Sequence, residues 1–440
     1  MKVNRTAGLQ TRAGTPVPAA SRARNGQVGR GTIVPLPIVI LCLLALSTSA
    51  FGQAFQERGY IENQTLIYPE TTPNDSGHVV NETLLRWEAS FQAYSWLKLN
   101  TALDARFDTH QQVEREWRLD VDDRSIQRPA FSLRRISATI HKGKFTAELG
   151  RQFIRWGKAD ILNPTDRFAP KDYLSSVVQS DFLGVNAARV TVESGSNTYD
   201  LVWQPWFTPS RTPLINQRWT FIPPQYLGYS IQDGGARYPG GSQYGARWNH
   251  VGSGYEYSLC FFDGFNNLPS FTASLLGPAA ATVTRYYPRL RLVGGDSAVP
   301  LPWFTIKGEA AYFDSPDKNN DEFVLYVIQL ERQVKEWSFV GGYAGEGVTK
   351  SLNPFQYSPE RGFARSFVGR AAWTIDPNRD LIFETAVRAN GSFARMQYTQ
   401  AFGQHWRGTA GAAWIRGDMS DFIGQYNQNS YFSMAARYSF

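Results

Sequence analysis

Cysteine is scarce in this 440-residue sequence, which contains only Cys42 and Cys260. So few thiols exclude a small domain held together by disulfides. The five histidines are spread from His78 to His405, and no two of them stand at metal-ligand spacing. Neither a G-x-S-x-G motif nor a Walker-type phosphate loop occurs. The sequence therefore predicts no metal centre and no cofactor site, and it offers no motif of an enzyme.

Long hydrophobic runs are also missing after residue 50, where nothing approaches the stretch of about 18 apolar residues that a membrane-spanning helix needs. Residues 1–50 differ, because six Lys and Arg residues without any Asp or Glu accompany an apolar run from Ile33 to Leu46. Small residues follow, including Thr48 and Ala50. This order is typical of a secretory signal peptide, which we predict over residues 1–50, with cleavage after Ala50 or after Ala54.

Positive charge is consequently concentrated at one end of the chain. The formal net charge is +7, and the leader accounts for nearly all of it. A nearly neutral mature chain does not have the basic surface that nucleic-acid binding requires, so we expect no nucleic-acid partner.

Alternation of apolar and polar residues dominates the remaining chain. Every second residue is apolar from Leu85 to Ala93, and the alternation resumes from Leu97 to Phe107 after the dipeptide Ser95-Trp96. A period of two identifies strands, and this pair predicts a hairpin. Similar segments of about ten residues recur, and that is the length of a tilted strand that crosses a bilayer, whereas strands of soluble sheets average about five or six residues.

We predict an all-β fold, a transmembrane antiparallel up-and-down barrel over residues 55–440 with about eighteen strands, sixteen being the alternative count. The predicted strands are 59–68, 84–94, 97–108, 131–141, 144–153, 185–194, 197–206, 243–251, 255–263, 283–293, 303–313, 322–332, 337–346, 365–375, 381–390, 393–402, 406–416 and 428–440. Short links such as Ser95-Trp96 and Gly195-Ser196 alternate with long ones, as periplasmic turns alternate with outside loops in outer-membrane barrels. The phase of the alternation slips within 131–141, where Arg134 and Ile136 share a face.

The last predicted strand has a distinctive apolar face, formed by Phe432, Met434, Ala436, Tyr438 and Phe440. An amphipathic final strand with a terminal aromatic residue resembles the β-signal of bacterial outer-membrane proteins. The resemblance implies that the barrel-assembly machinery recognises this strand.

Several short motifs resemble those of a poorly characterised group of porin-like outer-membrane proteins of Gram-negative bacteria, of the domain-of-unknown-function type. The motifs are Gly150-Arg151-Gln152, Trp156-Gly157, Asn163-Pro164-x-Asp166, the run Lys307 to Tyr312, Leu330-Glu331-Arg332 with Trp337, and the run Phe422 to Tyr426 before Arg437-Tyr438-Ser439-Phe440. The resemblance implies passage of solutes across an outer membrane and brings no established substrate.

The predicted third outside loop, at about 154–184, is the candidate constriction, because porins that this architecture resembles commonly fold their third loop into the lumen. The candidate constriction and pore-lining residues are Arg151, Arg155, Trp156, Lys158, Asp160, Asp166, Arg167, Lys171 and Asp172. Five positive charges against three negative ones indicate a preference for anions. The alternative is an outside loop closed by salt bridges that selects nothing.

Charged residues on the inward faces of the predicted strands favour a wet lumen, since lipid would not tolerate them. They are Arg86, Glu88, Lys98, Asp104, Arg106, Lys307 and Glu309. In the alternative reading, these residues pair into a stiff lining that does not conduct. The proline-rich loop at 208–241 is open to three readings: a cover of the mouth, a contact with lipopolysaccharide, or a partner site.

We therefore expect an outer-membrane channel that passes small polar solutes or ions, without a cofactor, in contact with membrane lipid and lipopolysaccharide. One alternative is a plugged barrel that transports hydrophobic compounds or serves an envelope export system. Another is a structural or adhesive barrel that binds a partner through its outside loops. Monomer and homotrimer both remain open.

Overall fold

The computed structural model describes residues 54–160, 162–222, 228–317, 320–351 and 356–440. The predicted signal peptide and the cleavage point after Ala50 lie outside these residues. Within them, no helix is both long enough and apolar enough to cross a membrane.

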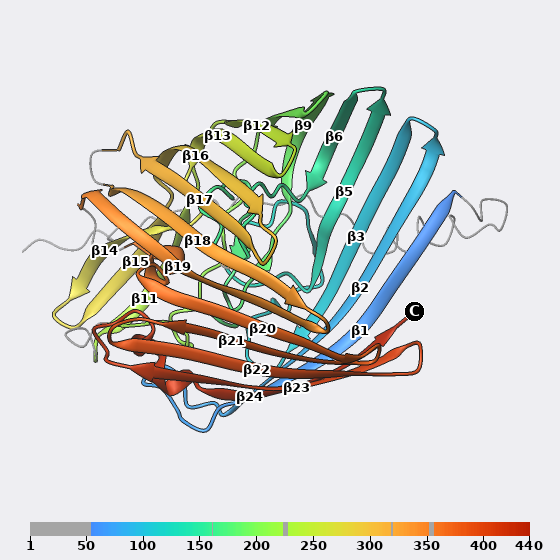
Figure 1. Cartoon of the computed structure of the whole chain (residues 1–440). Helices are drawn as coiled ribbons and strands as arrows, with labels where there is room; N and C mark the ends of the chain where they lie inside the picture. The colour runs from blue at the N-terminus through green and yellow to red at the C-terminus, as the bar shows by residue number, and fades with distance from the viewer. Residues whose placement is uncertain (1–53, 161, 223–227, 318–319, 352–355) are drawn as a thin grey trace, which may run out of the picture.

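Eighteen antiparallel strands form a closed barrel (Figure 1), which confirms the predicted fold and the higher of the two strand counts. The barrel strands are β1 (Phe55–Ile67), β2 (Val79–Tyr94), β3 (Leu97–Asp108), β5 (Phe131–Lys142), β6 (Phe145–Gln152), β9 (Val185–Ser194), β10 (Asn197–Gln204), β12 (Gln243–Gly252), β13 (Tyr255–Phe265), β16 (Arg289–Pro300), β17 (Thr305–Asp314), β18 (Glu322–Val334), β19 (Trp337–Lys350), β20 (Ser366–Asp376), β21 (Arg379–Val387), β22 (Gly391–Phe402), β23 (Trp406–Gly417) and β24 (Tyr431–Ser439).

Pairing of the last strand with the first closes the barrel. β24 runs antiparallel to β1, from Ile67 opposite Phe432 to Tyr60 opposite Ser439. Gly59 and Phe440 then exchange two backbone hydrogen bonds of 2.9 Å. The predicted short links lie at the same end of the barrel as these residues, and we call it the turn end; the opposite end is the loop end (Figure 1).

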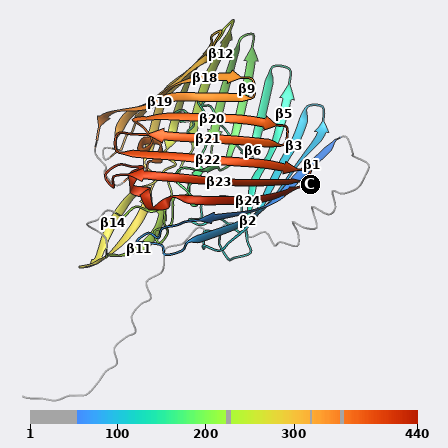
Figure 2. The ribbon, with the colours of Figure 1, turned by 60° about the horizontal axis from the view of Figure 1, so that its bottom comes forward.

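One predicted strand is wrong. The sequence placed a barrel strand at 283–293, whereas the barrel strand is β16 and residues Ala280–Tyr286 form β15 of a separate sheet with β11 (Ser230–Arg237) and β14 (Ser270–Gly277). Pro288 lies between the two strands and has no N–H group to donate to a continuous ladder. Both segments have the composition of a strand, so the pattern did not separate them. The small sheet stands at the loop end (Figure 2).

The phase slip within 131–141 is a β-bulge. Leu133 pairs with Leu103 and Arg135 pairs with Ala102, which leaves Arg134 as the extra residue between them. A bulge of this kind turns a side chain away from its regular alternation. The Arg134 guanidinium reaches Asp181 at 2.9 Å, inside the barrel.

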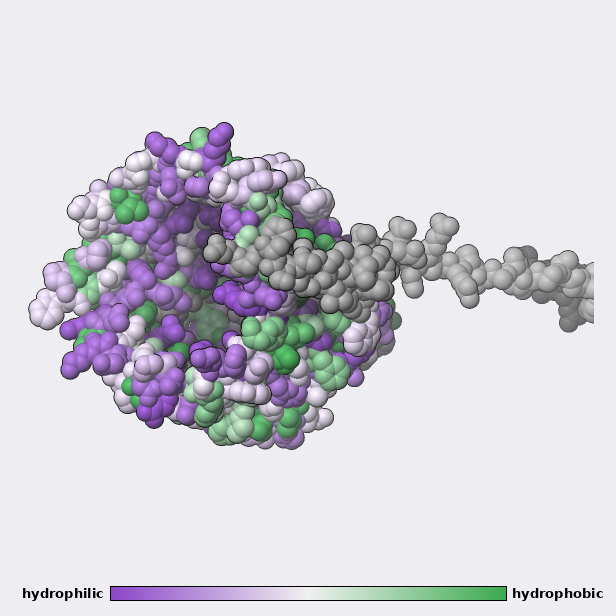
Figure 3. Space-filling model, turned by 90° about the vertical axis from the view of Figure 1, so that its right-hand side faces the viewer, coloured by the Kyte–Doolittle hydropathy of each residue, from purple (hydrophilic) through white to green (hydrophobic). Residues whose placement is uncertain are grey.

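The two faces of the wall have opposite character. Large apolar side chains are exposed on the outside, among them Leu201, Leu259, Phe367 and Met434, which are 57 to 69% exposed. Aromatic residues of the kind that form an interface girdle in outer-membrane barrels lie near the turn end. Trp337 and Trp373 are stacked there, with ring centroids 5.1 Å apart. Seen from that end, the molecule is hollowed and the hollow is lined by hydrophilic residues (Figure 3). This is the arrangement of a barrel with a lipid-facing exterior and a polar lumen.

Apolar side chains are also buried inside the barrel, in two clusters that join the inner wall to the loops. One cluster contains Trp156 and Phe168 with wall residues such as Leu325, and the other contains Trp219 with wall residues such as Ile415. Trp219 belongs to the proline-rich loop at 208–241, and this part of the loop packs inward. The loops and the inner wall therefore share two internal apolar cores.

Adjacent residues of β22 test the assignment of the two faces. Met396 points outward and is 44% exposed, whereas its neighbour Gln397 points into the lumen. We expect Met396→Lys to destabilise the barrel by about 2 to 4 kcal/mol, because the charge would enter hydrocarbon, and Gln397→Lys to be nearly neutral. The free energy of unfolding from lipid vesicles in denaturant measures the difference, and equal costs would contradict the assignment.

Candidate functional site

The segment between β6 and β9, residues 153–184, enters the barrel, and we call it loop 3. It leaves the wall at Gln152 on β6 and contacts Glu309 on β17 and Gln329 on β18. β17 lies six strands further around the wall than β6. Loop 3 therefore contacts the inner wall far from the strand that it leaves, and its role as a constriction remains a prediction.

The first part of loop 3 is fastened by carboxylates. Asp166 accepts hydrogen bonds from the backbone N–H groups of Trp156, at 2.5 Å, and Gly157, at 2.7 Å. The Trp156 indole donates to Asp200 on the wall at 2.9 Å, and its ring packs edge-on against Phe168. The turn is thus closed by Asp166 and held to the wall by a buried tryptophan.

The second part of loop 3 is fastened to the loop between β19 and β20, where the short helix α2 (Pro359–Gly362) carries Glu360. This carboxylate pairs with Arg167 at 2.5 Å and with Lys171 at 3.1 Å. Burial raises the pKa of Glu360, but the charges of Arg167 and Lys171 outweigh that effect and lower it to about 2. Glu360 is therefore ionised whenever the protein is folded at ordinary pH.

The third fastening point is Asp172, in the two-stranded ladder of β7 (Lys171–Asp172) and β8 (Asp181–Phe182). It pairs with Arg128 at 2.7 Å and with Arg211 at 3.3 Å, which come from the loops before β5 and before β12. Burial opposes ionisation, yet the two guanidinium groups hold the pKa of Asp172 well below its usual range. Three loops therefore meet at one carboxylate.

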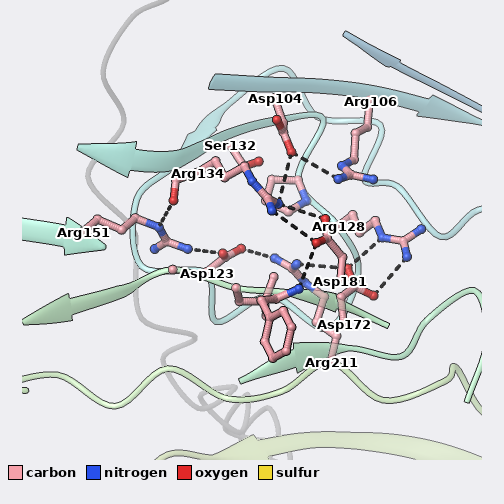
Figure 4. Close-up of a pocket in the computed structure, with 14 residues that line it drawn as sticks. Asp104, Arg106, Asp123, Arg128, Ser132, Arg134, Arg151, Asp172, Asp181 and Arg211 are labelled. Carbon is pink, nitrogen blue, oxygen red and sulfur yellow. Dashed lines mark hydrogen bonds and ion pairs between the residues drawn. The ribbon is translucent and has the colours of Figure 1, made fainter. Parts of the chain in front are cut away.

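Arginine and aspartate side chains continue this network to the wall (Figure 4). Its pairs are Arg86 with Asp104 at 2.7 Å, Arg106 with Glu82 at 2.5 Å, Arg134 with Asp181 at 2.9 Å, and Asp123 with both Arg151 and Arg211. A cavity lined by Asp104, Arg106, Arg134, Arg151 and Arg211, among others, has a volume of about 20 Å³, which is room for about one water molecule. We call this region, on β2, β3, β5 and β6, the arginine wall.

The candidate constriction residues do not share one environment. Arg151, Trp156, Asp166, Arg167 and Asp172 are buried and serve as fastenings, while Lys158 and Lys171 are held in ion pairs. Arg155 and Asp160 are the most accessible charges of the set, with 48% and 36% of their side chains exposed. A count of five positive and three negative charges therefore overstates how many of them meet the solvent.

Sequence reasoning missed the partners of these residues. Arg128, Arg211 and Glu360 lie in three other loops, and Asp123 lies in a turn with a positive φ of 59°. The alternation marked Arg86, Asp104 and Arg106 as inward-facing members of the network, and the phase slip marked Arg134. Within the part of the chain that is described, no three His, Cys, Asp or Glu side chains are grouped to hold a metal ion.

Comparison with protein-family models gave no match, and comparison with curated proteins gave none. Solved structures do resemble the chain. OccAB4 of Acinetobacter baumannii superposes with a TM-score of 0.52 at 8% identity, over 88% of this chain and 99% of its own. A BenF-like porin from Pseudomonas fluorescens Pf-5 and OccK3 (OpdO) of Pseudomonas aeruginosa each give 0.50 at 9% identity, over 89% of this chain and 99% of theirs. At such identities the likeness establishes a shared barrel fold.

Glu360→Gln tests the second fastening point. The substitution leaves Arg167 and Lys171 without a buried counter-charge, so we expect a loss of about 3 to 5 kcal/mol at pH 7. A carboxyl whose pKa falls from 4.5 to about 2 on folding contributes stability above pH 4.5 and loses it as the pH falls toward 2. The variant should lack that pH-dependent component.

Circular dichroism of thermal unfolding between pH 2 and pH 7 measures both effects. Asp376→Asn is the control, because Asp376 pairs with Arg379 at an exposed turn, where an ion pair contributes little. A Glu360→Gln profile that is parallel to the native one over this range would refute the assignment.

Proposed function

We propose that this protein is an outer-membrane channel of the porin-like type that passes small polar solutes and prefers those with negative charge. The observation that carries the proposal is that loop 3 crosses a polar lumen and is fastened opposite the arginine wall. A lumen of eighteen strands is wide enough for an aqueous passage, so an inserted loop determines its narrowest part.

A row of arginines supports the preference for anions. On β1, the ring of Tyr60 lies between the guanidinium groups of Arg437, at 4.2 Å, and Arg86, at 5.6 Å. Arg86 leads on to the arginine wall, and the exposed Arg155 of loop 3 lies over the ring of Phe182 at 4.2 Å. Arg437 pairs with Glu62 and Arg86 pairs with Asp104, each at 2.7 Å, so the attraction of this side of the lumen for an anionic solute depends mainly on the more accessible Arg155.

On the opposite side of the lumen, carboxylates outnumber cations. Glu256 of β13, Asp296 of β16, Glu309 of β17 and Glu331 of β18 lie there with Lys158, Arg247 and Lys307. Charges of opposite sign across a passage create a transverse field, which orients a polar solute. This asymmetry supports selection by charge and orientation.

The proposal includes the surroundings of the barrel. We assign its apolar exterior to contact with membrane lipid and lipopolysaccharide, and the final strand to recognition by the barrel-assembly machinery. The exposed outward residues Phe432, Met434 and Phe440 of that strand support the second assignment. A homotrimer and a monomer are equally compatible with the wall.

A plugged barrel is the second candidate, and the packed clusters around Trp156 and Trp219 favour it. Single-channel recording in planar bilayers under a salt gradient discriminates the two. Discrete current steps, with a reversal potential whose sign shows that anions permeate better than cations, support the channel. Silence from protein that is shown to be folded by its heat-modifiable migration would favour the plugged barrel.

Arg155→Ala tests the charge preference. Arg155 pairs with Asp166 at 3.4 Å, yet nearly half of its side chain is exposed, so its removal should shift the reversal potential toward cation selectivity. The backbone hydrogen bonds of Trp156 and Gly157 to Asp166 remain in the variant and keep the turn closed. Arg379→Ala, which removes a cation from an exposed turn at the turn end, should leave the reversal potential unchanged. Equal behaviour of the two variants would refute a role of loop 3 in selection.

A further inference from the structure

Glu309 of β17 is a buried carboxylate whose hydrogen bonds all reach loop 3. Only 3% of the residue is exposed. Its Oε1 atom accepts from the backbone N–H of Thr165 at 2.9 Å and from the Thr165 hydroxyl at 2.8 Å. Its Oε2 atom accepts from the backbone N–H groups of Lys158 at 3.1 Å and Ala159 at 3.2 Å. One side chain of the wall therefore binds two separate stretches of the loop.

The charge of Glu309 is balanced by these donors. Across the ladder, Glu309 stands opposite Asp296, another carboxylate. The nearby lysines pair with other acids, Lys158 with Asp296 at 3.4 Å and Lys307 with Asp160 at 3.1 Å. A buried carboxylate without its own counter-ion depends on the hydrogen bonds that it accepts. Loop 3 and Glu309 therefore stabilise each other.

A second contact holds the same part of loop 3 less completely. Gln329 of β18 accepts from the backbone N–H of Asp160 at 3.0 Å and donates to the Asp160 carboxylate at 2.5 Å. Asp160 is partly exposed, so water competes for these bonds. Glu309 and Gln329 are both buried, and Glu309 makes twice as many hydrogen bonds with the loop.

We propose that Glu309 is the positioning residue that holds the tip of loop 3, residues 158–160 and 162–165, against β17 and thereby sets the width of the passage. The statement about width rests on the proposed channel function, whereas the statement about the tip does not. These contacts require a carboxylate, because all four loop groups are donors and both oxygens of Glu309 accept from them. An amide would offer one acceptor oxygen, and its NH₂ group would face the remaining loop donors.

Glu309→Gln is the test variant, and Glu331→Gln is its matched control. Glu331 lies on the neighbouring strand β18, faces the same lumen and pairs with Lys307 at 2.7 Å. Both changes remove one negative charge from the same side of the lumen. The control removes no hydrogen bond to loop 3 that the structure contains, so differences between the two variants report the fastening of the loop.

Thiol accessibility measures the position of the tip. Leu162, 6% exposed, is replaced by cysteine after the buried Cys260 has been changed to alanine. In detergent-solubilised folded barrel, a small methanethiosulfonate reagent should label this cysteine at least ten-fold faster with Glu309→Gln than with Glu331→Gln or neither change. Equal labelling rates in the three proteins would overturn the assignment of Glu309.

Conductance measures the consequence. Glu309→Gln should raise the single-channel conductance and its current noise, while Glu331→Gln should change ion selectivity at an unchanged noise level. Faster labelling with unaltered conductance would support the fastening and overturn its effect on width. Absence of current from all folded variants, the parent included, would overturn the proposed channel and leave the labelling result to decide the fastening.

Thr165→Val keeps the test decisive if Glu309→Gln does not fold. This variant removes the hydrogen bond of 2.8 Å that the Thr165 hydroxyl donates to Glu309, and it leaves the carboxylate and its backbone hydrogen bonds in place. We expect faster labelling of Leu162→Cys than in the parent, and less than with Glu309→Gln where that variant folds. Labelling at the parent rate in folded Thr165→Val would count against the proposal. Heat-modifiable migration establishes the folded state of every variant.

Discussion

Pairing of every backbone polar group within the sheet is the constraint on which the structure depends. Hydrocarbon offers no hydrogen bonds, so a sheet in a membrane must have no free edge. The β24–β1 ladder and the Gly59–Phe440 bonds meet this requirement. Once the wall is closed and its outer face is apolar, the charged side chains of the strands must face the lumen. The polar lumen is thus a consequence of the closure, and it is what allows loops to bind inside it.

Charges inside the barrel act mainly as fastenings between segments that are distant in sequence. Asp172 joins Arg128 and Arg211, Glu360 joins Arg167 and Lys171, and Glu309 holds backbone donors of the loop. A buried carboxylate that lost its partners would carry a large desolvation cost, so each partner is held in place. The loops are ordered as one unit because their charges are shared. Few charges, such as that of Arg155, are left exposed to a solute.

The period of two was sufficient to predict the wall. Each barrel strand has one face toward lipid and one toward the lumen, so apolar and polar residues alternate along it. The same signal failed at 283–293, because β15 of the small sheet also has the composition of a strand and Pro288 alone marks the boundary with β16. It did register the bulge at Arg134. The alternation could not predict that Glu360 pairs with Arg167, 193 residues away in sequence. It shows which face of a strand is apolar, and it carries no information on which loops contact each other. The interior placement of loop 3 followed from resemblance, and its partners required the structure.

The chain order of the fastenings has a consequence for folding. Loop 3 precedes Glu309, Gln329 and Glu360 in the sequence, and its tip is separated from Glu309 by about 150 residues of intervening wall. Contacts between such distant segments form after local hairpins, because the chain entropy lost in closing a long loop must first be offset. Loop 3 can take its final position only when β17, β18 and α2 have joined the sheet. The contacts that hold loop 3 inside the barrel are therefore among the last to form, after most of the wall.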